Sequence, residues 1–232
     1  MIKRPCILFA DDDQDIQTIV SHIIRNAEME IILAANGKQA LEIWRSHPVD
    51  LVILDIMMPV LDGLETCRQI RAESNLPIIL LTAKGQEHEI VEGFEVGADD
   101  YIVKPFRQKE FIARVKARLK PVSHSNSRLS TTFDNLTLEL DSRRVSMQGK
   151  TIELTPLEFQ LLDYLMRHPG IVLTKEDLFR NVWGYSKSVD DSDLDLNLIE
   201  AAIRRLRRKL EDNPAQPRFI QTVWGAGYRF VN

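Results

Sequence analysis

The chain is poor in the features that mark secreted, membrane-embedded and zinc-binding proteins. Its 232 residues include only two cysteines, Cys6 and Cys67, each within an apolar-patterned segment. Two such cysteines make neither a disulfide framework nor a zinc site, and we expect both to be small core residues. No apolar run approaches the ~18 residues that a membrane span needs, and no signal peptide opens the chain. These absences predict a cytoplasmic protein with no membrane partner.

The chain also lacks the excess of positive charge expected of a wholly basic domain. The formal net charge is -4, and residues 121–232 carry 15 Lys and Arg against 15 Asp and Glu. Within this half the charges are segregated, because four aspartates between positions 190 and 195 precede a basic run at 204–209. This pattern predicts one basic face. The length allows one large domain or two of ordinary size.

In residues 1–120, short apolar runs alternate with amphipathic segments. The apolar runs predict strands at 6–10, 30–35, 50–54, 77–82 and 101–103. The amphipathic segments predict helices at 16–27, 38–46, 63–73, 87–96 and 109–119. This alternation predicts an α/β domain, a doubly wound five-stranded parallel sheet with helices on both faces. Right-handed crossovers then bring the C-terminal ends of all the strands to one edge.

Polar side chains follow these predicted strands at the edge where ligands bind in open α/β sheets. They are Asp11, Asp12 and Asp13 after the first strand, Asp55 after the third, Thr82 at the end of the fourth, and Lys104 after the fifth. Crowded carboxylates repel each other unless a cation joins them, and Mg²⁺ suits oxygen ligands of this kind. We interpret Asp13 as the N-cap of the first helix, which leaves Asp11 and Asp12 for the metal.

Asp55 is the predicted nucleophile of this edge. A carboxylate beside Mg²⁺ can attack phosphorus to give an aspartyl phosphate. Lys104 would neutralise charge on the phosphoryl oxygens, and Thr82 would donate a hydrogen bond to them. A cis Lys104–Pro105 bond would aim the lysine inward. The rival enzyme class, a phosphohydrolase of the haloacid dehalogenase type, wants a second acid at position 57, where this chain has Met57.

Five signatures in this order resemble the receiver domain of bacterial response regulators, over residues 3–120 and so within a first domain at 1–120. They are Asp11-Asp12, Asp55 with Met57-Met58-Pro59 and Asp62-Gly63, Thr82-Ala83, Gly97-Ala98-Asp99-Asp100-Tyr101, and Lys104-Pro105-Phe106. The resemblance implies that a sensor histidine kinase phosphorylates Asp55. Asp12, Asp55 and the Met57 carbonyl would then ligate Mg²⁺ directly, with Asp11 acting through water. It also makes Thr82 and Tyr101 the switch pair. The fold that it implies is flavodoxin-like.

The same resemblance implies a homodimer that forms on phosphorylation. Its face would comprise the predicted helix 87–96, the strand 101–103 and the helix 109–119. The charged residues expected on this face are Asp99, Asp100, Glu110, Arg114, Lys116 and Arg118. Ile90 departs from the pattern, because a basic residue usually stands there to pair with Glu110. This departure keeps open a second reading, a regulator that binds DNA without phosphorylation.

The second half opens after a serine-rich stretch, 121–129, that is typical of a flexible linker. Alternating patterns at 133–140, 144–147 and 150–154 predict a small antiparallel sheet. Thr155, Pro156 and Glu158 give a cap, a first-position proline and a capping box for a helix that runs to about 168. A second helix is predicted from 174 to about 183. Apolar residues spaced 4, 3 and 4 apart, from Ile199 to Leu210, predict a third helix within 192–211.

A terminal hairpin with a Gly-Ala-Gly turn follows at 219–230. Together with the motifs at 154–159, 205–210 and 225–230, this order resembles the winged-helix α+β effector domain of the OmpR/PhoB subfamily, over residues 130–232. The resemblance implies double-stranded promoter DNA as partner, with the third helix in the major groove, the wing in the minor groove, and tandem half-sites bound by a dimer. RNA polymerase is a further candidate partner.

The expected DNA contacts are Asn197, Ala201, Arg204, Arg205, Arg208, Trp224 and Arg229. Asn197 is suited to adenine and Ala201 to a thymine methyl. Arg204 and Arg205 would serve bases or phosphates, and Trp224 would pack either on a sugar or on its own hairpin. The sequence thus predicts a phosphorylation-controlled transcription regulator, not an enzyme acting on an external substrate.

Overall fold

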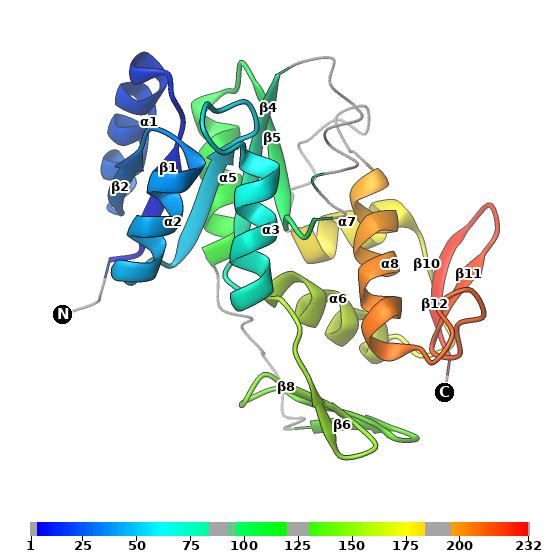
Figure 1. Cartoon of the computed structure of the whole chain (residues 1–232). Coiled ribbons are helices and arrows are strands. Elements are labelled where there is room, and N and C mark those ends of the chain that lie inside the picture. Colours follow the sequence, from blue (N-terminus) through cyan, green and yellow to red (C-terminus); the bar gives the residue numbers. More distant parts are fainter. Residues whose placement is uncertain (1–3, 84–92, 94–95, 120–129, 184–195, 232) are drawn as a thin grey trace. The chain divides into compact units, whose positions relative to one another are not determined.

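In the computed structural model the chain forms two compact units, residues 1–119 and 120–232 (Figure 1). The described residues are 4–83, 93, 96–119, 130–183 and 196–231. Most of the predicted helix 87–96, including Ile90, therefore lies outside them, as do the predicted linker and the acidic loop at 190–195. Each unit is described by itself.

The first unit is built on a parallel sheet in the order β2-β1-β3-β4-β5. Its strands are β1 (Cys6–Ala10), β2 (Glu30–Ala34), β3 (Leu51–Asp55), β4 (Ile78–Ala83) and β5 (Asp100–Lys104). Every residue of β1 and β3 is buried, as expected for central strands covered on both faces. The predicted doubly wound sheet is confirmed.

The helices described in this unit are α1 (Gln14–Asn26), α2 (Gly37–Ser46), α3 (Gly63–Glu73) and α5 (Gln108–Leu119). One face of the sheet packs against α1 and α5, where Phe9 and Phe111 share a core with Ile24. On the other face α2 and α3 lie side by side (Figure 1). Asp13 caps α1 as predicted, because its carboxylate accepts hydrogen bonds from the N–H groups of Asp15 and Ile16.

The second unit begins with an antiparallel sheet of four strands, β6 (Ser130–Phe133), β7 (Leu136–Glu139), β8 (Arg144–Met147) and β9 (Lys150–Ile152). The prediction of a single strand over 133–140 is wrong. The chain turns between β6 and β7 at Asp134, whose φ is +52°. Asp and Asn accept this left-handed conformation more readily than other side chains, so the pair Asp134-Asn135 ends one strand and allows the next to begin.

In the rest of this unit the structure describes three helices and a second sheet. The helices are α6 (Pro156–Arg167), α7 (Lys175–Trp183) and α8 (Asn197–Leu210). The strands β10 (Val172–Leu173), β11 (Ile220–Val223) and β12 (Gly227–Phe230) form an antiparallel sheet in the order β10-β12-β11. The predicted apolar stripe from Ile199 to Leu210 is fully buried. This is the predicted winged helix, with the β11–β12 hairpin as its wing.

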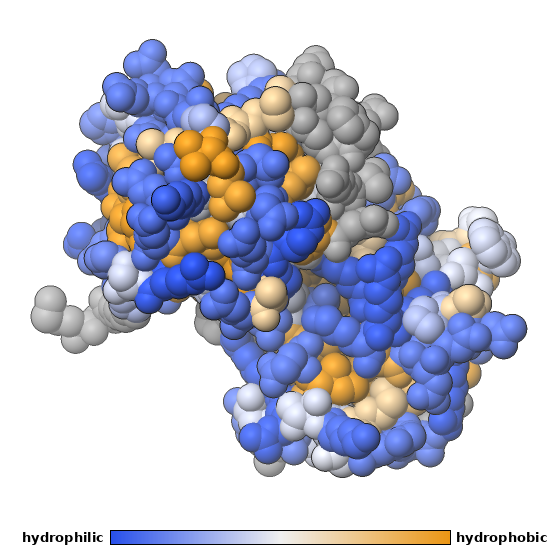
Figure 2. Space-filling model, viewed as in Figure 1, coloured by the Kyte–Doolittle hydropathy of each residue, from blue (hydrophilic) through white to orange (hydrophobic). Residues whose placement is uncertain are grey.

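Hydrophilic residues cover the outward surfaces of α2, α3 and α8 on the face that Figure 2 shows. Within the first unit, Figure 2 shows hydrophobic residues between α2 and α3. None of the helices within the described residues is long and apolar enough to cross a bilayer.

Candidate phosphoacceptor site and nucleic-acid interface

Three carboxylates meet at the C-terminal edge of the first sheet. The side chains of Asp11, Asp12 and Asp55 each offer an oxygen, and these oxygens lie within 4.8 Å of one another. The cause is the parallel pairing of β1 with β3, which places Ala10 opposite Leu54 and so sets the next residues of both strands side by side. Asp11 and Asp55 are buried, whereas Asp12 is exposed. The structure thus brings together the three carboxylates that the sequence predicted at this edge.

Lys104 joins the carboxylates. Its Nζ lies 2.8 Å from Asp11 Oδ2 and 2.7 Å from Asp55 Oδ1. The Lys104–Pro105 bond is cis, as predicted. Burial raises the pKa of Asp55 to about 6, although its hydrogen bond to Lys104 opposes this shift. Burial alone would lower the pKa of Lys104, but its hydrogen bonds to Asp11 and Asp55 outweigh burial, so this pKa lies above its ordinary value.

The donor set suits a hard divalent cation. Its side-chain ligands are all carboxylate oxygens, and among the described residues they outnumber the ammonium group of Lys104 that pairs with two of them. Asp11 is already engaged, since Oδ1 accepts the Asp13 N–H at 3.0 Å and Oδ2 binds Lys104. The carboxylates of the exposed Asp12 and of Asp55 are therefore better placed than that of Asp11 to bind Mg²⁺ directly. Met57 is 62% exposed, directly beyond this cluster.

Asp62 and Gly63 hold the start of α3 against the end of β3. Asp62 caps the helix by accepting the Glu65 N–H at 2.7 Å, and the Gly63 N–H donates to Ile56 O at 2.9 Å. A Cβ at Gly63 would overlap the carbonyl oxygen of Asp55. The close approach explains why glycine follows the cap here, and it fixes the backbone that carries Asp55.

The two predicted switch residues lie on neighbouring strands. Thr82 is buried near the end of β4, and its Oγ1 lies 3.3 Å from the carbonyl oxygen of Ala83. Tyr101 on β5 is buried as well, and the Arg114 guanidinium lies over its ring at 5.9 Å from the centroid. The segment that joins the two strands is mostly outside the described residues.

Several charges predicted for a dimer face are paired with each other within the first unit. Arg114 Nη1 lies 2.9 Å from Asp100 Oδ1, and its Nη2 lies 2.9 Å from Glu110 Oε1. Arg118 Nε lies 3.9 Å from Asp100 Oδ2. Lys116 is exposed. Asp100, Glu110, Arg114 and Arg118 thus form one network along β5 and α5.

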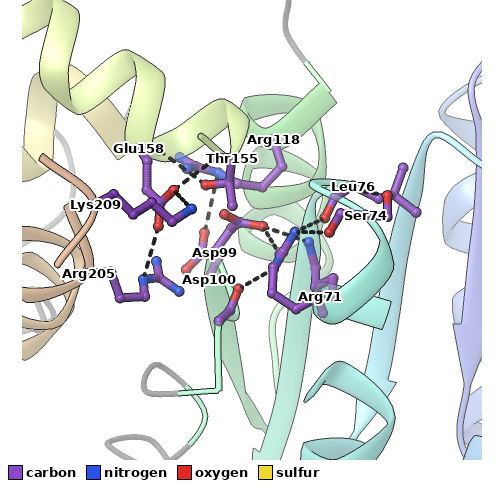
Figure 3. Close-up of polar contacts among 12 residues, drawn as sticks. Arg71, Ser74, Leu76, Asp99, Asp100, Arg118, Thr155, Glu158, Arg205 and Lys209 are labelled. Atoms are coloured by element: carbon purple, nitrogen blue, oxygen red, sulfur yellow. Dashed lines mark hydrogen bonds and ion pairs between the residues drawn. The ribbon is translucent and has the colours of Figure 1, made fainter. Parts of the chain in front are cut away.

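Asp99, also predicted for the dimer face, is bonded apart from this network. Its Oδ2 accepts hydrogen bonds from Arg71 Nη2 at 2.8 Å and from the Ile78 N–H at 2.9 Å (Figure 3). Arg71 also donates to the carbonyl oxygens of Gly97, Ser74 and Leu76. Asp99 is therefore held inward at the junction of α3, β4 and β5. Its position next to Asp100 in the sequence gave no sign that the two side chains diverge.

The exposed side of α8 carries Asn197, Arg204 and Arg208. Their spacing of seven and four residues places them on one face of the helix, opposite the buried stripe. Ala201 lies beside this face with 8% of its surface exposed. These positions agree with the predicted basic face.

Arg205 does not lie on this exposed face, and its contact with DNA stays a prediction. Its Nε lies 3.6 Å from Glu158 Oε1, and its side chain is 9% exposed. Lys209, one turn further along α8, places Nζ 2.6 Å from Glu158 Oε2 (Figure 3). Glu158 also accepts the Thr155 N–H at 3.0 Å and so completes the predicted capping box of α6. Arg205 and Lys209 together neutralise this buried carboxylate.

The wing presents Trp224 at its tip, where the side chain is 92% exposed. This exposure contradicts the alternative that Trp224 packs on its own hairpin. Arg229, in the middle of β12, is half-buried and its Nη2 lies 3.2 Å from Gln221 Oε1.

Comparison with known proteins identifies the class that this architecture defines. Residues 7–116 match the family described as "Response regulator receiver domain", and residues 149–230 match "Transcriptional regulatory protein, C terminal". The chain belongs to the response regulators of the OmpR/PhoB type. It is accordingly a DNA-binding two-component regulator of transcription, and this family is not one of enzymes in the usual sense.

Several relatives match over nearly their full length. The chain is 38% identical to the DNA-binding response regulator MtrA of Mycolicibacterium smegmatis, over 97% of this chain and 96% of that protein. It is 37% identical to the probable transcriptional regulator ycf27 of Cyanidium caldarium, over 96% and 92% respectively. The crystal structure of DrrB from Thermotoga maritima, an OmpR/PhoB homologue, superimposes with a TM-score of 0.51 at 31% identity, covering 99% of this chain and all of DrrB.

Proposed function

We propose that Asp55 accepts a phosphoryl group from a sensor histidine kinase. The observation that carries this proposal is the cluster at the sheet edge, in which Lys104 Nζ lies within 2.8 Å of both Asp11 and Asp55. An Asp55 oxygen would attack the phosphorus of a phosphohistidine. The P–N bond would break, and its electron pair would remain on the imidazole.

The surrounding residues would support this transfer. Lys104 would shift from its carboxylate partners to the incoming phosphoryl oxygens, and Thr82 would donate its hydroxyl hydrogen to them. Asp12, Asp55 and the Met57 carbonyl would hold Mg²⁺ directly, and Asp11 would hold it through water. The bound ion would supply charge neutralisation at the phosphoryl oxygens. Asp11 would also keep Lys104 in place before the phosphoryl group arrives.

Phosphorylation would then act through a receiver domain at 1–120, a linker at 121–129 and a DNA-binding domain at 130–232. The phosphoryl group adds about -1.5 to -2 charges near Thr82, and Tyr101 would respond with it. The charged network of Asp100, Glu110, Arg114 and Arg118 would re-pair across a homodimer, and the exposed Lys116 would join it. Joining two DNA-binding domains raises their effective concentration on tandem half-sites.

DNA binding would use the exposed side of α8 and the wing. Asn197, Ala201 and Arg204 would contact bases or the backbone in the major groove, and Arg208 would contact phosphates. Trp224 would pack on a sugar at the minor groove, with Arg229 nearby on the same hairpin. The protein would act on promoter DNA in the cytoplasm, with RNA polymerase as a further partner.

The test of the phosphoryl transfer is intact mass after incubation with acetyl phosphate and Mg²⁺, with oligomer size measured in parallel. We expect one added phosphoryl group in the wild type, none in Asp55→Asn, and a dimer only in the phosphorylated sample. Asp13→Asn is the matched control, since Asp13 is an exposed helix cap in the same loop, and it should be modified like the wild type. A folded wild type that gains no mass would contradict the proposal and favour DNA binding without phosphorylation.

A further inference from the structure

Helix α8 holds one residue of the wing by both of its backbone groups. The Ile220 N–H donates to Glu211 Oε1 at 2.9 Å. The Ile220 carbonyl oxygen accepts from Arg207, at 2.9 Å from Nε and 2.7 Å from Nη2. Arg207 lies in the last turn of α8 and Glu211 follows its end, one helical turn apart, so both side chains reach the same strand.

These bonds cover an exposed sheet edge. β11 is the edge strand of the order β10-β12-β11, and an edge strand presents unpaired N–H and C=O groups on its outer side. Glu211 also accepts the N–H groups of Arg218 at 2.7 Å and Phe219 at 3.0 Å. Arg207 Nη2 also donates to Thr222 Oγ1 at 2.9 Å. Two side chains of the helix region therefore take the place of a neighbouring strand.

Arg207 is thereby committed to the protein, although it stands within the basic run of α8. Its guanidinium carbon lies 5.7 Å from the centroid of the Tyr228 ring on β12. Arg204 and Arg208, on either side of it in the sequence, are exposed. The Arg207 guanidinium thus bonds the helix to the wing.

We infer that Arg207 and Glu211 are positioning residues that set the wing at a fixed place relative to α8, so that helix and wing reach two grooves of one duplex together. The inference rests on the proposed function, in which α8 and the wing bind DNA. Two contacts held in one rigid body bind without the entropy cost of ordering the second, whereas a loosened wing incurs that cost on binding.

Glu211→Gln separates this role from simple electrostatics. Removing a negative charge beside DNA should leave binding unchanged or strengthen it, if charge alone matters. The positioning role predicts the opposite. The Glu211 carboxylate accepts three consecutive backbone N–H groups. In glutamine one oxygen is replaced by an NH₂ group, which is itself a donor and cannot accept a hydrogen bond from a backbone N–H.

The experiment uses the full chain, incubated with acetyl phosphate and Mg²⁺, and a duplex that the wild type enriches from a random-sequence library. Hydroxyl-radical footprints and the salt dependence of affinity are measured for the wild type, Arg207→Lys, Glu211→Gln and the matched control Arg208→Ala. We expect Arg207→Lys and Glu211→Gln to lose protection at the wing segment, keep it at the α8 segment, and bind about tenfold more weakly. Arg208→Ala should keep both segments and lower the salt slope by about one.

A readout without DNA guards against general unfolding. Amide hydrogen exchange should accelerate at residues 219–223 in Arg207→Lys and Glu211→Gln, with α6 and α7 unchanged. Faster exchange throughout the second unit would mark general instability and overturn the positioning role. So would normal affinity with an intact wing footprint in both variants. A wild type that enriches no duplex would overturn the proposed DNA binding and this inference with it. If the wild type does bind a duplex, the variants test the positioning role alone.

Discussion

Asp55, the proposed phosphoacceptor, lies in a position that costs stability. Burial raises the pKa of this carboxyl from its ordinary 3.8 to about 6. The folded state therefore binds the proton more tightly than the unfolded chain does. Stability from this group is fully present below pH 4 and is lost as the pH rises through about 6, because the charged carboxylate is then buried near Asp11 and Asp12.

Asp55→Asn should consequently stabilise the metal-free protein. We expect a gain of about 1–3 kcal/mol in the free energy of unfolding above pH 6 and little gain at pH 4. Urea denaturation of the wild type and the variant in a chelating buffer at pH 4, 6 and 8 measures the gain at each pH. Asp13→Asn, an exposed cap replaced by an equally good cap, should change stability by less than about 1 kcal/mol. A variant no more stable than the wild type at pH 8 would contradict the assigned burial cost.

At the scale of elements, the junction between α3, β4 and β5 depends on one arginine. Arg71 is 13% exposed and pairs with Asp99, which is 1% exposed. Arg45, by contrast, pairs with Glu73 at the surface, with exposures of 52% and 54%. The two pairs have similar distances, 2.8 Å and 2.7 Å, so burial is what distinguishes them.

Arg71→Ala should destabilise the first unit by about 3–5 kcal/mol, because it leaves the Asp99 carboxylate buried without its cation. Arg45→Ala should cost no more than about 1 kcal/mol. Chemical denaturation followed by circular dichroism compares the two. Equal losses would show that Asp99 is solvated once Arg71 is removed.

The wing contains two glycines with positive φ that differ in their surroundings. Gly225 has φ +74° and open space around a Cβ, whereas Gly227 has φ +148° and a Cβ there would overlap the carbonyl oxygen of Leu173. Gly225→Ala should cost about 1 kcal/mol of stability from the backbone alone. Gly227→Ala should cost more, about 1–3 kcal/mol from its φ with the overlap in addition. Thermal unfolding of both variants tests this order, and an equal loss in both would contradict it.

At the scale of the whole molecule, phosphorylation is proposed to act by joining two chains. Acetyl phosphate should therefore tighten binding to a duplex with two tandem half-sites by at least about 10²-fold. Binding to a single half-site should change little. Fluorescence anisotropy with both duplexes, for the wild type and Asp55→Asn, makes the comparison. Equal tightening on both duplexes would indicate that the phosphoryl group changes the DNA-binding domain itself and not the oligomer.

Much of the fold and of the phosphoacceptor site follows from the order of residues alone. The sequence alone predicted that polar residues at or next to the strand ends would meet, since a parallel sheet gathers its C-terminal ends at one edge. These residues are Asp11, Asp55, Thr82 and Lys104. Caps are equally local, because Asp13 and Thr155 bond to N–H groups two or three residues away. The one strand that was misread, 133–140, contains a turn whose signal is only two residues long.

The sequence by itself therefore determined the two domain types, the cluster around Asp55 and the basic character of α8. Only the tertiary structure decided which charges of that helix are paired within the domain and which stay exposed. Arg205 is bound to Glu158 and Arg207 to the backbone of Ile220, while Arg204 and Arg208 stay exposed. In the sequence all four arginines belong to one basic run, and their residue type does not separate the paired ones from the exposed ones. Their roles differ because α6 and β11 lie against two sides of α8, and what packs beside a helix is set by residues distant in the chain.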